Sequence, residues 1–470
     1  MIQFGTDGWR GIIAEDYTAD NICLVAQAFA NYLTKQAVTK PVVIGYDARF
    51  MSQRFAQWVA RVIAANGIRV LMADRICPSP AIAWAAKLLD TAGGIMITAS
   101  HNPAPYNGIK FKTAYGGSAP PEIMAAIEEC LRELEISGKI PEMMDFNQAV
   151  REQRVTYFNP VDLHQQQIIN FIDLDLVASV QGKVVFDALH GAAMGYMDSL
   201  VGAKIKLTEI RASINPAFGG VNPEPIAQNL AALVETVTNQ QAVLGLATDG
   251  DGDRIGAIDA DGSFINSHQI FAILIKYFLE KKAWYGDIAC TCTVSNLVEK
   301  LAGKYGLTVH RTPVGFKYIC NLMLTQDIMI GGEESGGIGI KDYIPERDGI
   351  LLALLLIEAV AAYQKTLGAI LQDIAKEVGE FFYHRVDIAM EKDSMAKLID
   401  FLRSGGLKIM AGAEVQELQC VDGIKCLLTD GWVMFRASGT EPVLRIYAEA
   451  ATPSRLTELL KFGSELAAGI

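Results

Sequence analysis

The chain alternates short apolar runs with longer segments whose apolar residues recur at helical spacing. Each run is followed by a polar loop, and the runs occupy residues 42–44, 95–97, 184–186 and 244–246. Helical periodicity is clearest over residues 55–65 and 123–134. Strands that are buried on both faces read as continuous apolar runs, and the helices between them cover the sheet. The alternation therefore predicts an α/β fold in which helices cover the sheets.

Length and composition indicate several domains. A chain of 470 residues is too long for one hydrophobic core, and its 51% apolar residues can bury sizeable cores. Composition changes at a charged connector over residues 139–153, at a turn-rich segment over 259–262 and again around 377–385. Beyond the last change the chain alternates strand and helix patterns on its own, which predicts a separate, smaller α+β domain.

Charge and composition argue against several classes of partner. The net charge of −12 disfavours nucleic acid, whose phosphates are bound mainly by Lys and Arg. The longest apolar stretch, residues 350–363, is too short to span a bilayer and predicts a buried helix. The eight Cys lack CxxC spacing, and no basic segment followed by an apolar one marks a signal peptide. We therefore expect a cytoplasmic protein that binds neither membranes nor nucleic acid.

A hydroxyl, an imidazole and an amide follow the apolar run at residues 95–97, in the order Thr-Ala-Ser-His-Asn-Pro. Ligands of open α/β sheets gather at the carboxyl ends of strands, where this turn is expected. Ser100, beside His101 and followed by the chain-stopping Pro103, therefore has the position of an exposed nucleophile. The alternative is an Asn-Pro turn in which Ser100 only caps the backbone.

Three carboxylates stand at alternate positions after the apolar run at residues 244–246. Asp249, Asp251 and Asp253 are separated by glycines, so their oxygens can surround one hard cation. Mg²⁺ usually keeps coordination positions for water and a substrate phosphate, and three carboxylates leave those positions open. The segment is not an EF-hand loop, because Arg254 and Ala260 occupy the positions that require Gly and Glu. The alternative is a solvated acidic turn, which repulsion between the carboxylates disfavours.

Two glycine-rich segments offer groups suited to a sugar phosphate. Residues 331–337 present Glu333 and Ser335 to sugar hydroxyls, although a plain hairpin loop would have the same composition. Residues 436–442 combine a guanidinium, two hydroxyls and backbone N–H groups into a phosphate cradle, with Arg445 nearby. The alternative for this second segment is a Ser/Thr-Gly turn.

In this order, the four segments resemble those of the α-D-phosphohexomutases, the phosphoglucomutase/phosphomannomutase superfamily. Residues 4–11, 45–49, 107–110 and 219–225 also match family motifs, so the resemblance runs from Phe4 to about Arg445. It implies three similar mixed α/β domains and a smaller C-terminal α+β domain around a central cleft. With the composition changes above, we predict domains that carry the phosphoserine, metal, sugar and phosphate loops at residues 1–150, 151–262, 263–376 and 377–470.

The resemblance also implies roles for individual side chains. Ser100 would be a phosphoserine, and Asp249, Asp251 and Asp253 would hold Mg²⁺ together with an oxygen at Ser100. Candidates for acid–base catalysis and charge neutralisation are His101, Lys110, Arg10 and Arg254. The expected sugar contacts are Thr312, Gly315, Lys317, Glu333 and Ser335, and the expected phosphate contacts are Arg436, Ser438, Gly439, Thr440 and Arg445.

The implied reaction interconverts hexose 1-phosphate and hexose 6-phosphate, with glucose 1,6-bisphosphate as intermediate and activator. Gly337 and Phe316 stand where the phosphomannomutase pattern commonly has His, which favours the phosphoglucomutase branch and glucose phosphates. Residues 346–349 resemble that branch too, although Arg347 stands where it often has Lys. Mannose phosphates stay open as substrates, since the two sugars differ in one hydroxyl orientation.

Other activities share part of this motif set. A hexose-1,6-bisphosphate synthase would use the same phosphoserine and metal but release the bisphosphate as its product. A non-catalytic phosphosugar-binding protein would keep the phosphate cradle and lose Ser100 or the aspartates, all of which are present. A serine hydrolase is disfavoured because the segment around Ser100 lacks the Gly-x-Ser-x-Gly elbow. The motifs do not specify an oligomeric state.

Overall fold

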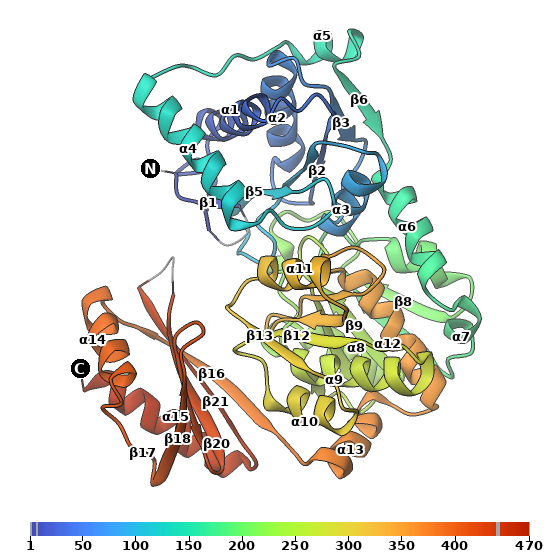
Figure 1. The fold of residues 1–470 in the computed structure, drawn as a ribbon. Helices are drawn as coiled ribbons and strands as arrows, with labels where there is room; N and C mark the ends of the chain where they lie inside the picture. Colours follow the sequence, from blue (N-terminus) through green and yellow to red (C-terminus); the bar gives the residue numbers. More distant parts are fainter. Residues whose placement is uncertain (1, 6–7, 439–441, 470) are drawn as a thin grey trace.

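The computed structural model describes residues 2–5, 8–438 and 442–469 of the chain. Within these ranges the strands form four sheets, each with its own helices (Figure 1). The first three sheets belong to mixed α/β units, and the fourth belongs to a C-terminal α+β unit. The predicted fold class is therefore confirmed, and the apolar runs singled out in the sequence are all strands.

The first sheet runs in the order β1-β5-β4-β2-β3-β6. Its strands are β1 (Trp9–Ile12), β2 (Val42–Tyr46), β3 (Val70–Ala73), β4 (Gly93–Ile97), β5 (Tyr106–Lys112) and β6 (Val155–Phe158). The helices of this unit are α1 (Ala19–Lys35), α2 (Ser52–Ala65), α3 (Ser79–Leu88), α4 (Pro121–Ser137) and α5 (Phe146–Arg151). Every residue of β2 and β4 is buried, as helices on both faces of a sheet require. The predicted boundary at residue 150 falls inside α5, before β6 pairs in parallel with β3.

The second sheet runs in the order β11-β10-β9-β7-β8. Its strands are β7 (Lys183–Asp187), β8 (Lys206–Ile210), β9 (Leu244–Thr248), β10 (Ile255–Asp259) and β11 (Phe264–Ile265). The α-helices of this unit are α6 (Pro160–Phe171), α7 (Leu174–Ala178) and α8 (Ala231–Gln240), and shorter helical turns are η1 (Asp198–Gly202), η2 (Phe218–Gly220) and η3 (Ala227–Asn229). β9 and β10 pair antiparallel, so the aspartate segment is the loop that connects them.

The third sheet runs in the order β13-β12-β14-β15. Its strands are β12 (Asp287–Thr291), β13 (Val309–Thr312), β14 (Ile328–Gly332) and β15 (Ile338–Ile340). The helices are α9 (Ser267–Tyr277), η4 (Phe278–Lys282), α10 (Asn296–Lys304), α11 (Phe316–Thr325), α12 (Gly349–Tyr363) and α13 (Leu367–Val378). The predicted sugar loop is the connection between the antiparallel strands β14 and β15.

The fourth sheet runs in the order β16-β21-β20-β19-β18-β17 and is antiparallel throughout. Its strands are β16 (Phe382–Ala389), β17 (Ile409–Met410), β18 (Ala413–Gln419), β19 (Ile424–Leu428), β20 (Gly431–Ala437) and β21 (Val443–Ala450), with helices α14 (Lys392–Arg403) and α15 (Pro453–Ala468). This unit lies to one side of the third (Figure 1). Cys292 of the third unit is buried against Trp432, Met434 and Tyr447 of the fourth.

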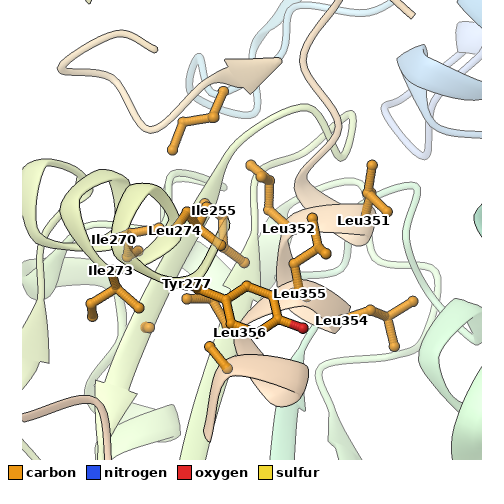
Figure 2. Packing of buried hydrophobic residues seen from close by; sticks show 14 of the residues in the cluster. Ile255, Ile270, Ile273, Leu274, Tyr277, Leu351, Leu352, Leu354, Leu355 and Leu356 are labelled. Atoms are coloured by element: carbon orange, nitrogen blue, oxygen red, sulfur yellow. The ribbon is translucent and has the colours of Figure 1, made fainter. Parts of the chain in front are cut away.

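Helix α12 joins the second and third units through the largest apolar core. It contacts α7, β9 and β10 of the second unit and α9 of the third. Figure 2 shows Leu352 and Leu355 of α12 in the same buried cluster as Ile270 and Leu274 of α9. Residues 349–360 are all buried, which confirms the buried helix that the sequence predicted.

The described residues contain no single helix with the length and apolar character needed to cross a membrane. In the part of the chain that the structure describes, α12 and α13 meet those two criteria only when taken together, and their axes are bent by 73° at the short break between them.

Truncating one leucine of α12 should destabilise this shared core. Leu355 is fully buried, so Leu355→Ala leaves a cavity between units and should cost about 2–5 kcal/mol of unfolding free energy. Urea unfolding followed by circular dichroism measures the change. Leu324→Ala is the matched control, because that leucine is 47% exposed. Equal unfolding midpoints for Leu355→Ala and the unsubstituted protein would contradict the packing described here.

Candidate active site

Ser100 lies in the turn between β4 and β5, where the sequence placed it. Its backbone has a φ of 53°, in the left-handed region that residues other than glycine seldom adopt. The Ser100 N–H donates to Thr98 Oγ1 at 2.8 Å, which closes the turn. The side chain is almost entirely buried, so the exposed position that the sequence predicted is wrong, because the turn packs against the loop that follows β9.

Arg49, in the loop between β2 and α2, holds this turn in place. Its guanidinium donates to the carbonyl oxygens of Ser100 and Asn102, both at 2.6 Å, and to two further carbonyls of the same segment. Asp47 pairs with the Arg49 Nε at 3.3 Å, and both side chains are fully buried. One arginine therefore fixes the backbone of the turn that carries Ser100.

The structure brings the β4–β5 turn and the β9–β10 loop together. Ser100 Oγ donates to Asp249 Oδ2 at 2.7 Å, although the two residues are 149 positions apart. A Cβ on Gly250 would lie 2.4 Å from the Ser100 carbonyl oxygen, so only glycine permits this approach. The predicted nucleophile and the predicted metal ligands therefore share one buried site.

Cations lie among the three aspartates. Lys110 of β5 donates to Asp251 Oδ2 at 2.7 Å and to Asp253 Oδ2 at 3.2 Å. Burial together with the neighbouring carboxylates raises the pKa of Asp249 well above its usual range. Burial also opposes ionisation of Asp251, but the Lys110 ammonium and hydrogen bonds outweigh it and lower the pKa of that carboxyl. The repulsion expected between the aspartates is thus partly offset by the chain itself.

The donor set at this point fits a hard divalent cation. The three aspartates can each offer an oxygen, and these atoms lie within 4.8 Å of one another. Within the described residues, Asp251 Oδ1 and Asp253 Oδ1 are buried and have no hydrogen-bond partner. Buried carboxylate oxygens normally have a partner, and oxygen is the ligand atom that Mg²⁺ prefers. The orphaned oxygens are the observation that supports a cation here.

The remaining predicted catalytic residues surround Ser100. His101 Nδ1 is 3.5 Å from Ser100 Oγ, and Arg10 donates to Asn102 Oδ1 at 2.6 Å. Arg254 Nε lies 3.9 Å from Asp249 Oδ2. Burial and the nearby cations, Arg254 first among them, lower the pKa of His101 well below its usual range. Positive side chains therefore lie near Ser100 alongside the aspartates, where a phosphate ester would need them.

The predicted sugar residues are only partly brought together. Gly315 N–H donates to Glu333 Oε1 at 3.1 Å, which ties the start of α11 to the β14–β15 loop. Within the part of the chain that the structure describes, Ser335 Oγ is buried without a hydrogen-bond partner. Thr312 ends β13 and donates to the adjacent carbonyl, while the Lys317 ammonium lies 5.5 Å from the Tyr318 ring centre.

The predicted phosphate residues lie on two paired strands of the fourth sheet. Arg436 of β20 is directly opposite Arg445 of β21, so two guanidinium groups share one end of the sheet. Arg436 Nε donates to Asp422 at 2.9 Å, and Ser438 follows β20 with its N–H donating to the Val443 carbonyl. Gly439 and Thr440 lie outside the described residues.

Two polar contacts join the fourth unit to the sugar side of the third. Arg385 of β16 donates to Glu334 at 3.2 Å, next to the predicted sugar residues. Asp422 also accepts the Val314 N–H at 3.0 Å, so it links the β13–α11 loop to Arg436. The two arginines of the predicted phosphate cradle therefore belong to a unit that is tied to the sugar loop.

Sequence reasoning missed several residues that build the site. Ser79, at the start of α3, donates to Asp251 Oδ2 at 2.5 Å, and Arg347 pairs with Asp253 at 2.9 Å. Lys112 and Ser118 both donate to the buried Glu346 at 2.6 Å. Arg49 and Arg347 stand in matched motifs, although Arg49 had no assigned role there. No local pattern marks these contacts, because Ser79, Lys112, Ser118 and Arg347 act across units and Arg49 reaches a residue 51 positions away.

Four consecutive parts of the chain match the models of the four domains of the phosphoglucomutase/phosphomannomutase family. The α/β/α domains I, II and III match residues 1–136, 162–262 and 266–378, and the C-terminal domain matches residues 395–462. The matched parts together make up most of the chain and follow the order of the four sheets.

Individual proteins are similar over nearly the whole chain. A phosphoglucomutase/phosphomannomutase of Thermococcus kodakarensis is 31% identical over 98% of both chains. A phosphoglucosamine mutase of Carboxydothermus hydrogenoformans is 32% identical, covering 97% of this chain and 96% of its own. A solved structure from Thermus thermophilus, named as a candidate phosphomannomutase, has a TM-score of 0.87 and 33% identity over 100% of this chain and 99% of its own. With the shared buried site, these matches show that the chain belongs to the phosphoglucomutase/phosphomannomutase family of phosphotransferase mutases.

Proposed function

We propose that this enzyme interconverts hexose 1-phosphate and hexose 6-phosphate, with glucose phosphates favoured, and that Ser100 carries the phosphoryl group. The observation that carries the proposal is the 2.7 Å contact between Ser100 Oγ and Asp249 in a buried, cation-lined site. In-line phosphoryl transfer needs chiefly positioning and neutralisation of charge, and this site offers both.

The chain's own residues position the reacting groups. Arg49 holds the turn so that the Ser100 hydroxyl points at the aspartates, and Lys110, Arg10 and Arg254 supply positive charge around it. Asp249, Asp251 and Asp253 would hold Mg²⁺, which would neutralise charge that develops on the transferred phosphoryl group. The donor set and its orphaned oxygens support this role of the aspartates.

Proton transfer and charge neutralisation fall to different residues. When a sugar hydroxyl attacks the phosphoserine, a new O–P bond forms, the bond from phosphorus to Ser100 Oγ breaks, and the hydroxyl proton must be accepted. His101 Nδ1 lies 3.5 Å from Ser100 Oγ, whereas Lys110 donates to two carboxylates. Of the two acid–base candidates predicted from the sequence, we therefore assign His101 as the base that accepts the proton and Lys110 as the residue that neutralises charge.

The phosphate that does not react is at C1 in one binding mode and at C6 in the other, and both modes must place it in the same cradle. We assign the phosphate that does not react to Arg436, Ser438, Gly439, Thr440 and Arg445, and the sugar hydroxyls to Thr312, Gly315, Lys317, Glu333 and Ser335. The Gly315–Glu333 contact and the buried Ser335 hydroxyl support the sugar assignment. The opposed arginines on β20 and β21 support the phosphate assignment. Each predicted domain thus contributes one loop.

The identity of the sugar rests on this chain's departures from the phosphomannomutase pattern. Gly337 and Phe316 favour glucose phosphates, with glucose 1,6-bisphosphate as the intermediate and activator. Similar proteins are named for glucose, mannose and glucosamine phosphates, and the last of these was not weighed in the sequence analysis. We retain glucose, expect small-molecule sugar phosphates as partners rather than nucleic acid or membranes, and expect the enzyme to work in the cytoplasm.

Removal of the Ser100 hydroxyl tests the proposal directly. Ser100→Ala should lower turnover of glucose 1-phosphate by several orders of magnitude and leave sugar-phosphate binding largely intact, because only the phosphoryl carrier is lost. Intact-protein mass spectrometry should show a one-phosphate adduct that this variant lacks. Ser404→Ala, at an exposed serine of the fourth unit, is the control. Near-normal activity of Ser100→Ala would sink the proposal.

Arg49 offers a test of positioning. In Arg49→Lys the positive charge beside Asp47 remains, but one ammonium cannot reach the carbonyls that the guanidinium holds. We expect kcat to fall about ten- to hundredfold, because Ser100 is no longer fixed in the attacking position. Arg54→Lys, an exposed change on the neighbouring helix, should leave kcat within twofold. An unchanged kcat in Arg49→Lys would show that the turn carrying Ser100 keeps its conformation without the guanidinium.

A further inference from the structure

Both departures from the phosphomannomutase pattern converge on a single side chain, Arg347. A Cβ placed on Gly337 would lie 2.2 Å from Arg347 Cδ, which is far inside van der Waals contact. On the other side, Arg347 Cζ lies 5.4 Å from the centre of the Phe316 ring. The two positions are 21 residues apart in the sequence, yet the arginine occupies the space between them.

Arg347 also contacts carboxylates of two different loops. Its Nη2 lies 2.9 Å from Asp253 Oδ2, in the aspartate loop, and its Nη1 lies 3.5 Å from Glu333 Oε2, in the sugar loop. Its Nε lies 3.2 Å from Glu346 Oε1. The side chain is only 8% exposed, so these charges face one another with little water between them. A planar guanidinium suits this bridge because its donors point in fixed directions.

We propose that Arg347 is a positioning residue that links the metal carboxylate Asp253 to the sugar carboxylate Glu333, and that Gly337 is required because its missing side chain makes room for it. The proposal rests on the proposed function, since it gives Asp253 and Glu333 their roles. It also links the pair of departures, because Gly337 leaves room for the Arg347 stem and Phe316 offers a ring face to its guanidinium.

A one-methyl substitution is the sharpest test. In Gly337→Ala the new Cβ must displace the Arg347 stem, so the bridge should be lost while every charged group is kept. We expect kcat/KM for glucose 1-phosphate to fall at least about tenfold, with a similar fall in Arg347→Ala. Gly303→Ala is the matched control, because a Cβ there meets no atom within 4 Å, and it should leave kcat/KM within about twofold.

The double variant shows whether the losses in Gly337→Ala and Arg347→Ala arise from one shared contact or from two independent effects. If Gly337 matters only through Arg347, Gly337→Ala combined with Arg347→Ala should be no worse than the more damaged single variant. Losses that multiply in the double variant would overturn the proposal. So would a Gly337→Ala enzyme with unchanged kcat/KM.

Arg347→Lys distinguishes bridging from mere support of the fold. A lysine keeps one charge beside Asp253 but cannot also reach Glu333, so kcat should recover relative to Arg347→Ala while KM for the sugar phosphate stays raised. Recovery of both constants to the level of the unsubstituted enzyme would overturn the bridge.

The contact can also be measured without activity. The same double-variant cycle on thermal unfolding should be non-additive if Gly337 and Arg347 share one space, whatever the substrate is. An inactive parent enzyme with a non-additive cycle would refute the proposed function and leave the contact standing. If the unsubstituted enzyme is active, but the changes in melting temperature add and the losses of kcat/KM multiply in the double variant, the contact alone is refuted.

Discussion

The structure depends on a buried cluster of opposite charges where the three α/β units meet. Residues 346–349 run through this cluster: Glu346 accepts a hydrogen bond from Lys112 of the first unit, and Arg347 pairs with Asp253 of the second. Removing one partner of a buried ion pair typically costs about 3–5 kcal/mol, because the other charge is left uncompensated. The units are thus held in one relative arrangement by the charges that also surround Ser100. The same buried charges therefore hold the units together and set the positions of the groups around Ser100.

The apolar core begins where the charged cluster ends. Asp348 accepts the N–H groups of Ile350 and Leu351 and so caps α12, and it also bonds His164 of the second unit at 2.6 Å. Gly349 N–H donates to the Gly252 carbonyl in the aspartate loop, and a Cβ on Gly349 would lie 2.2 Å from the Arg254 carbonyl oxygen. The helix that fills the shared core is therefore anchored directly to the loop that carries the three aspartates. Loss of packing around α12 would be felt at the site through this connection.

The sequence allowed the fold class and the two central loops to be predicted, because both are local signals. Apolar runs and helical periodicity specify elements over a few residues, and Asp249 and Ser100 each follow such a run. What could not be predicted is the pairing of distant residues. Nothing near Arg49 shows that its donors reach the carbonyl of Ser100, and nothing near Arg347 shows that it meets Asp253. Lys110 was predicted as an acid–base candidate from its motif, but only the fold shows that two carboxylates already engage it.

The product formed from glucose 1-phosphate decides whether this enzyme is, as proposed, a mutase with a phosphoserine at Ser100. A mutase keeps the bisphosphate through both half-reactions, so rapid formation of glucose 6-phosphate should need only a catalytic amount of glucose 1,6-bisphosphate. Nuclear magnetic resonance of phosphorus follows all three species in one sample. Slow isomerisation with stoichiometric build-up of glucose 1,6-bisphosphate from a phosphoryl donor would contradict the claim and identify a bisphosphate synthase.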